Sequence, residues 1–153
     1  MAQNSSRMAG RHFLHIPGPT PVPDRVLRAM DTPMIDHRGP EFAKLAKKCL
    51  EGIKTVFKTT NPVIIYTATG TGAWEGALVN TLSPGDKVLM VETGQFGVLW
   101  KKMAEKLGLV PELMSTDWRT GVDPKAIEAR LREDKKHEIK AVCVLHNETA
   151  TGC

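Results

Sequence analysis

From residue 63 onward, short apolar runs alternate with segments in which apolar residues recur every three or four positions. Four runs have the length of strands: 63–67, 87–92, 110–114 and 141–146. Three intervening segments have the periodicity of helices: 73–82, 96–107 and 124–132. Strands that alternate with helices through short loops predict an α/β fold, a largely parallel sheet flanked by helices.

The first sixty residues carry a different pattern. Four prolines in residues 17–23 exclude a helix there and predict a stiff, extended segment. Asp24 is expected to cap a short helix that ends at Met30, and Gly39-Pro40 is expected to begin a longer helix that ends near residue 59. We therefore expect three parts: a flexible tail and entry segment (1–16), a proline-rich arm with helices (17–62) and an incomplete α/β domain (63–153).

The last predicted strand, 141–146, is followed by only seven residues. A parallel strand in an α/β fold is normally followed by a crossover helix that returns to the sheet. The sequence is therefore expected to stop within the domain, as the N-terminal part of a longer protein.

Composition excludes several classes of protein. Among 153 residues, 41% are hydrophobic and 25% are charged, which is typical of a soluble globular protein, and no apolar run approaches the ~20 residues of a membrane span. The net charge is +4, but the lysines are spread over several predicted helices and aromatic residues make up only 5% of the chain. We therefore expect neither a membrane partner nor a nucleic-acid partner.

Three widely spaced cysteines, Cys49, Cys143 and Cys153, form neither a disulfide framework nor a zinc pattern. They favour a reducing compartment. We expect the cytoplasm, with a peroxisome left open for a eukaryotic protein.

A glycine-rich turn between the predicted strand 63–67 and the helix after it is the first candidate for chemistry. In open α/β sheets, ligands bind beyond the carboxyl ends of the strands, and a helix N-terminus there suits a phosphate. The turn Thr69-Gly70-Thr71-Gly72 lacks the Lys-Ser/Thr pair of a nucleotide P-loop, and Glu75 replaces the third glycine of a dinucleotide-binding motif. The spacing alone is compatible with two interpretations of this turn, an anion-binding site and a plain tight turn.

Residues 69–86, which begin Thr-Gly-Thr-Gly-Ala-Trp-Glu-Gly, resemble the phosphate-binding segment of serine–glyoxylate aminotransferases. Three further stretches agree, in the family's order: Pro-Gly-Pro (17–19), His-Arg-Gly-Pro-Glu-Phe (37–42) and His-Asn-Glu-Thr-Ala-Thr-Gly (146–152). The chain is thus similar, from about residue 12 to residue 152, to class V pyridoxal-phosphate aminotransferases of the serine–glyoxylate/alanine–glyoxylate type.

The resemblance implies the large domain of a type I pyridoxal-phosphate transferase, here truncated, with pyridoxal 5'-phosphate as cofactor. It implies a homodimer for the complete protein. It also implies small amino-acid and 2-oxo-acid substrates, with an amino group transferred from serine or alanine to glyoxylate.

The resemblance also assigns roles to individual residues. Thr69, Gly70 and Thr71 would hold the cofactor phosphate, Phe96 would stack on the pyridine ring, Thr149 would reach its phenolic-oxygen or substrate side, and Gly18 would line the substrate carboxylate pocket. Without the resemblance, Phe96 is an ordinary core aromatic residue and both Thr149 and Gly18 are turn residues. His37 and Arg38 are open to two interpretations: they contact a substrate or a subunit interface, or they are ordinary polar surface residues.

The lysine that binds the cofactor covalently is expected beyond Cys153, together with the carboxylate on the ring nitrogen and the substrate-binding arginine. We therefore assign no catalytic residue and no metal ligand, and expect the 153 residues alone to be inactive. Three alternatives remain: another class V enzyme such as a cysteine desulfurase, a non-catalytic truncated product, and an α/β domain for a different phosphate ligand. Cysteine desulfurases tend to carry histidines where this chain has Thr71 and Phe96.

Overall fold

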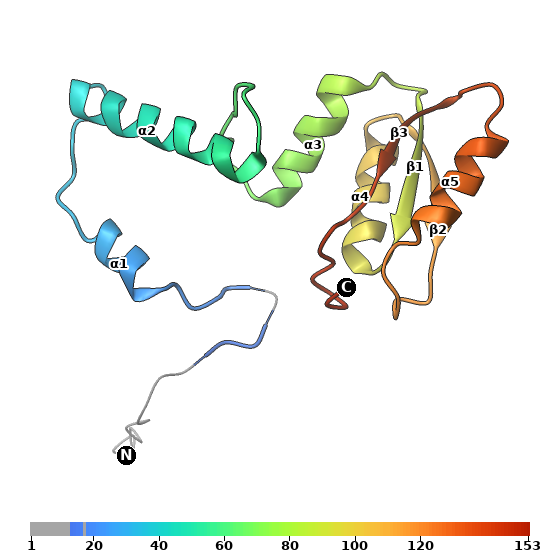
Figure 1. Cartoon of the computed structure of the whole chain (residues 1–153), viewed down its shortest axis with the longest axis horizontal. Helices are drawn as coiled ribbons and strands as arrows, with labels where there is room; N and C mark the ends of the chain where they lie inside the picture. Colours follow the sequence, from blue (N-terminus) through green and yellow to red (C-terminus); the bar gives the residue numbers. More distant parts are fainter. Residues whose placement is uncertain (1–12, 17) are drawn as a thin grey trace, which may run out of the picture. The chain divides into compact units, whose positions relative to one another are not determined.

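The computed structural model describes residues 13–16 and 18–153, and the chain divides into two compact units, Met1–Ile64 and Ile65–Cys153 (Figure 1). Residues 1–12 of the predicted tail and entry segment (1–16) lie outside the described residues, as does Pro17. No helix in the described part of the chain is long and apolar enough to cross a membrane.

The first unit contains two helices, α1 (Asp24–Met30) and α2 (Pro40–Phe57), close to their predicted bounds. Pro23, and not Asp24, occupies the N-cap position of α1, so the predicted cap is wrong by one residue; Asp24 lies in the first turn, where a negative charge favours the helix dipole. No described residue of this unit is buried. The apolar stripe of α2 is therefore not covered within the unit.

The second unit is built around a sheet of three parallel strands: β1 (Lys87–Glu92), β2 (Val110–Ser115) and β3 (Ile139–Cys143). Their order is β2-β1-β3, so β1 is central. Its four middle residues, Val88 to Val91, are at most 4% exposed, although their side chains alternate between the two faces. Both faces of the central strand are therefore covered.

Two helices connect these strands. The helix α4 (Gln95–Lys106) leads from β1 to β2, and α5 (Pro124–Glu133) leads from β2 back across β1 to β3. Because these crossovers run in opposite directions and are normally right-handed, the two helices belong on opposite faces of the sheet, and Figure 1 shows them on either side of β1. Asp123 caps α5 as predicted, since its carboxylate accepts a hydrogen bond from the Lys125 amide at 2.9 Å.

A further helix, α3 (Gly70–Thr81), packs against α4. Leu78 of α3 and Ala104 of α4 form a buried cluster with Val88 and Met90 of the central strand. The α/β fold with parallel strands flanked by helices is thereby confirmed.

The predicted strand at 63–67 is wrong. These residues belong to no strand, and Ile64, Ile65 and Tyr66 are 72%, 66% and 51% exposed. A strand needs a neighbour to accept and donate its backbone hydrogen bonds, and no described segment pairs with this one. The glycine-rich turn therefore does not follow a strand of the observed sheet.

Two other elements of the second unit differ from the prediction by more than one residue. The helix α3 begins at Gly70 instead of residue 73, so the glycine-rich segment forms the first turn of the helix. The last strand is Ile139–Cys143 instead of 141–146, because its ladder with β1 runs only from Lys87 opposite Ile139 to Met90 opposite Cys143.

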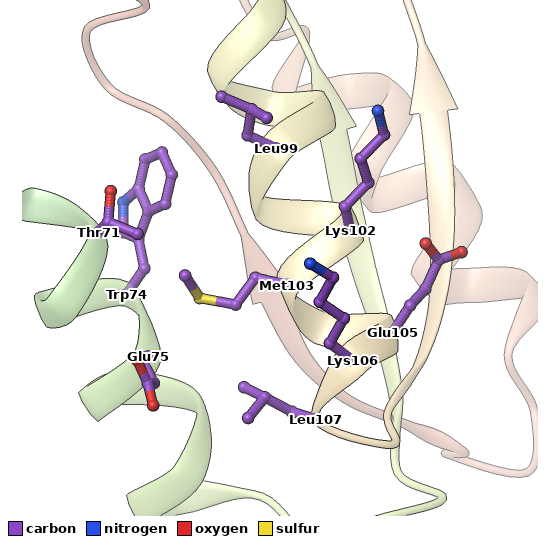
Figure 2. A pocket seen from close by; sticks show the side chains of 9 residues that line it. All are labelled: Thr71, Trp74, Glu75, Leu99, Lys102, Met103, Glu105, Lys106 and Leu107. Atoms are coloured by element: carbon purple, nitrogen blue, oxygen red, sulfur yellow. The ribbon is translucent and has the colours of Figure 1, made fainter.

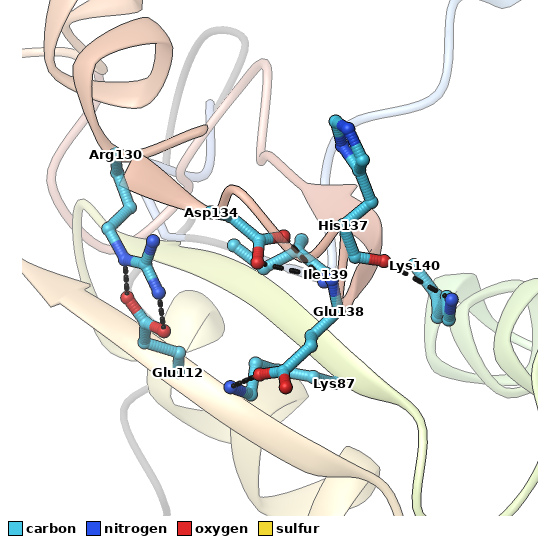
Figure 3. Close-up of polar contacts among 8 residues, drawn as sticks. All are labelled: Lys87, Glu112, Arg130, Asp134, His137, Glu138, Ile139 and Lys140. Atoms are coloured by element: carbon cyan, nitrogen blue, oxygen red, sulfur yellow. Dashed lines mark hydrogen bonds and ion pairs between the residues drawn. The ribbon is translucent and has the colours of Figure 1, made fainter. Parts of the chain in front are cut away.

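Carboxylates hold α5 and the loop after it to the sheet (Figure 3). The Arg130 guanidinium makes two hydrogen bonds to Glu112 of β2, one of them 2.7 Å from Nη2 to Oε2. Asp134 accepts hydrogen bonds from the Ile139 amide at 2.8 Å and the Glu138 amide at 3.1 Å. The hydrogen bond from Arg130 lowers the pKa of Glu112, and that from the Ile139 amide lowers the pKa of Asp134.

These lowered pKa values predict an acid-dependent loss of stability. A carboxyl group with a folded-state pKa below its ordinary value, 4.5 for Glu112, stabilises the fold fully above that value and loses the contribution as the pH falls through the folded-state pKa. We expect the urea midpoint to fall between about pH 5 and about pH 3, and to fall less steeply in Glu112→Gln. Urea unfolding followed by circular dichroism at several pH values measures this; equal slopes would contradict it.

Candidate functional site

The N-terminus of α3 presents backbone amides that have no hydrogen-bond partner among the described residues. Thr69 occupies the N-cap position, and no side chain in the described part of the chain caps the helix. The amide of Gly72 donates to the Thr69 carbonyl oxygen at 3.0 Å. The amides of Gly70 and Thr71 donate to no described residue. Together with the helix dipole, these free donors favour a bound anion.

The two glycines of this turn have different surroundings. A Cβ atom placed on Gly70 would meet nothing within 4 Å, whereas one on Gly72 would lie 2.5 Å from the Ala68 Cβ. Gly72 is thus required for close packing, while Gly70 faces open space. Thr69 and Thr71 are also exposed, so two hydroxyl groups accompany the free amides.

One turn further along α3, Trp74 connects this helix to the start of α4. Its ring meets Phe96 edge to face, with centroids 6.1 Å apart and planes at 71°, and stacks on Trp100 at 5.2 Å. Phe96 is half-buried and lies at the second residue of α4. The aromatic contact therefore brings the predicted ring-contacting residue close to the helix that carries the predicted phosphate-binding residues.

An open groove of about 710 Å³ also lies between α3 and α4 (Figure 2). Thr71 and Trp74 line it from α3, the side chain of Met103 extends toward it from α4, and that of Leu107 does so from the residue after α4. Neither Phe96 nor any residue of the loop after β3 lines it. The groove is a helix–helix surface that shares Thr71 with the candidate site but includes neither Phe96 nor Thr149.

The loop after β3 reaches the start of α4 through a buried carboxylate. Glu148 is 0% exposed and accepts hydrogen bonds from the amides of Phe96 and Gly97, both at 3.1 Å, and of Ala150 at 3.0 Å. Thr149 follows directly and is exposed. The loops after β1 and β3 meet here because the carboxyl ends of parallel strands share one edge of the sheet.

The predicted site residues thus fall into two groups. The second unit contains Thr69, Gly70 and Thr71 at the start of α3, Phe96 at the start of α4, and Thr149 in the loop after β3. Gly18, His37 and Arg38 belong to the first unit, and their parts in a substrate pocket or interface stay predictions. The described residues form no cluster of three or more side chains that could hold a metal ion.

Sequence reasoning missed two residues that organise this region, Glu148 and Trp74. Glu148 stands inside the quoted His-Asn-Glu-Thr stretch, and Trp74 inside the quoted glycine-rich run. A signal was present for the first: α4 begins after Gly94, which has no side chain to cap a helix, so its first amides need an acceptor from elsewhere.

Uncapped helix-terminal amides on an α/β fold, on a helix whose Trp74 contacts Phe96, are features that suit a phosphorylated ring compound. The aminotransferase class-V model matches residues 12–153, and the chain belongs to this family. The family depends on pyridoxal phosphate, which is such a compound.

Curated relatives agree with this assignment. The chain is 52% identical, over 97% of its length, to serine–glyoxylate aminotransferase of Methylorubrum extorquens, of which it covers 37%. It is 46% identical, over 95% of its length, to L-aspartate–glyoxylate aminotransferase of Paracoccus denitrificans, again covering 37%. The chain therefore spans somewhat more than a third of the length of these relatives.

Among solved structures, an alanine–glyoxylate aminotransferase from Nostoc sp. superimposes with a TM-score of 0.81 at 29% sequence identity. The match covers 99% of this chain and 40% of the other. The fold of the described residues is thus that of the corresponding part of an aminotransferase.

Proposed function

We propose that this chain forms the phosphate-binding and ring-contacting part of a pyridoxal-phosphate-dependent aminotransferase that transfers an amino group from serine or alanine to glyoxylate. The observation that carries the proposal is the pair of free amides at Gly70 and Thr71, in a chain that is 52% identical to a serine–glyoxylate aminotransferase. The chemistry of the cofactor fits these residues: a phosphate needs hydrogen-bond donors and room, and Gly70 offers both.

Each proposed residue has one task. The amides of Gly70 and Thr71 and the hydroxyls of Thr69 and Thr71 donate hydrogen bonds to the phosphate, whose charge the α3 dipole also stabilises. Phe96 contacts the face of the pyridine ring, and Thr149 supplies a hydroxyl from the loop after β3. When bound, pyridoxal phosphate supplies an electron sink that allows an amino group to move between an amino acid and a 2-oxo acid.

Glyoxylate is the better supported of the two substrates. The names of the serine-, aspartate- and alanine-dependent relatives share glyoxylate and differ in the amino donor. We give serine precedence because that relative is 52% identical, against 46% for the aspartate enzyme. Glycine formation from glyoxylate by the full natural polypeptide, with serine, alanine and aspartate supplied in turn, tests this order of amino donors, and a preference for aspartate would overturn it.

We further propose that the covalent lysine is not among the lysines of this chain. In the described residues, the lysines with hydrogen bonds or ion pairs, namely Lys54, Lys87, Lys101 and Lys140, contact groups outside the candidate site. The complete enzyme would supply the lysine from other residues and would act as a cytoplasmic homodimer, so that these 153 residues alone are expected to be inactive.

Replacing Phe96 with alanine is expected to weaken binding of pyridoxal phosphate by about 1 kcal/mol, roughly fivefold, because stacking on the ring is lost. Phe96→Tyr keeps the ring and should bind as the unchanged protein does. Cofactor titration followed by absorbance, in the full natural polypeptide that carries this sequence, measures both. Equal affinity in Phe96→Ala would remove Phe96 from the site.

A further inference from the structure

The helix α4 lacks a cap of its own and receives one from a distant part of the chain. Gly94 is its N-cap residue, and no side chain of the adjoining sequence caps the helix. The carboxylate of Glu148 accepts from the amides of Phe96 and Gly97 instead, although Glu148 and Phe96 are 52 positions apart in sequence. The charge of the carboxylate also complements the positive end of the helix dipole.

Gly94 and Glu148 fit each other sterically. A Cβ atom on Gly94 would lie 2.5 Å from the Glu148 Cγ and 2.6 Å from its Cδ. Gly94 has extended backbone, with φ 169°, which any residue adopts, so the need for glycine comes from the space that Glu148 takes. The lack of a side chain at Gly94 therefore leaves the space that the Glu148 carboxylate occupies.

The loop that carries Glu148 is also closed upon itself and fastened to the end of β1. The amide of Glu148 donates to the Cys153 carbonyl at 2.6 Å, and the amide of Gly152 donates to the Glu148 carbonyl at 2.8 Å. The hydroxyl of Thr151 donates to the Thr93 carbonyl at 3.1 Å. Thr149 is therefore held in a short closed loop whose anchor is the same carboxylate that fixes the backbone of Phe96.

We infer that Glu148 is a positioning residue of the cofactor site, which sets Phe96 and Thr149 relative to each other by accepting hydrogen bonds from the start of α4 and from the loop after β3. The inference rests on the proposed function. It predicts that Glu148 acts on ring binding through Phe96 and Thr149, and that it contributes nothing to the phosphate contacts at Gly70 and Thr71.

A cap that served only stability would behave like Asp123. That residue is exposed and bonds the amide two positions along its own helix, α5, so its loss should destabilise the protein without touching the site. Asp123→Ala is thus a matched control for Glu148→Gln, which keeps the size of the side chain but removes the charge and part of the accepting capacity.

The test compares these variants in the full natural polypeptide that carries this sequence. We expect Glu148→Gln to bind pyridoxal phosphate about tenfold more weakly, to reduce the circular dichroism band of the bound cofactor and, without cofactor, to speed hydrogen exchange at the Phe96 and Gly97 amides. Affinity for inorganic phosphate should not change, and Asp123→Ala should leave all four measurements as they are.

Suppose that the wild-type protein binds pyridoxal phosphate and that Glu148→Gln changes neither the cofactor affinity nor the dichroism band. That result would overturn the inference about Glu148 and leave the proposed function standing. A wild-type protein that binds no pyridoxal phosphate would overturn the proposed function and the inference with it. Should Glu148→Gln not fold, Gly94→Ala displaces the carboxylate from the other side, and normal cofactor binding in that variant would overturn the inference.

Discussion

A leucine in place of Gly70 is expected to weaken binding of pyridoxal phosphate by at least about tenfold, or ~1.4 kcal/mol. The reason is steric, because a side chain at this position would enter the open space from which the phosphate approaches the amides of Gly70 and Thr71. The fold should tolerate the change, since a Cβ atom at Gly70 meets nothing within 4 Å. Cofactor titration followed by absorbance, with thermal unfolding alongside, separates the two effects.

Gly121→Leu is the matched control. Gly121 also has nothing within 4 Å of an added Cβ atom, but it lies in the loop between β2 and α5. The same substitution there should change neither cofactor affinity nor stability appreciably. If Gly70→Leu binds the cofactor as tightly as Gly121→Leu does, the phosphate site is not at the start of α3.

A second large effect is expected at the centre of the sheet. Leu89 of β1 is 0% exposed, and Leu89→Ala should lower the free energy of unfolding by about 3 kcal/mol, from lost burial and the cavity that remains. Val110→Ala on the neighbouring strand β2, where the side chain is 50% exposed, should cost less than about 1 kcal/mol. Urea unfolding measures both, and equal losses would contradict the assignment of β1 as the buried central strand.

Most of the second unit could be predicted from the sequence because local and tertiary preferences agree there. The strand Lys87–Glu92 has its predicted bounds, since its apolar run is bounded by Gly85-Asp86 and by Thr93-Gly94. Asp123-Pro124 marks the start of α5 for a chemical reason, a capping carboxylate before a proline in the first turn.

The errors have two physical causes. An apolar run such as 63–67 has the composition of a strand, but a strand also needs a partner, and sequence pattern does not show whether one is present. The glycines of residues 70–72 favour a turn, but they form the first turn of α3, where the cost of glycine to a helix is small.

The candidate site was only partly predictable for a related reason. Thr69, Gly70 and Thr71 are contiguous and form a local motif, so their pattern was sufficient to suggest an anion site. Glu148 acts on amides more than 50 positions away, and nothing in its immediate neighbours indicates that its carboxylate is buried against α4. Long-range caps of this kind become visible only once the strands have been ordered.

The central claim, that the start of α3 holds the phosphate of pyridoxal phosphate, is tested most directly by nuclear magnetic resonance. The polypeptide that carries this sequence, labelled with ¹⁵N at glycine and threonine, is titrated with pyridoxal phosphate and, separately, with pyridoxal, which lacks the phosphate. We predict that the amide signals of Gly70 and Thr71 shift with pyridoxal phosphate and not with pyridoxal, while that of Gly121 shifts with neither. Binding of pyridoxal phosphate that leaves the Gly70 and Thr71 signals in place, or equal shifts with pyridoxal, would contradict the account.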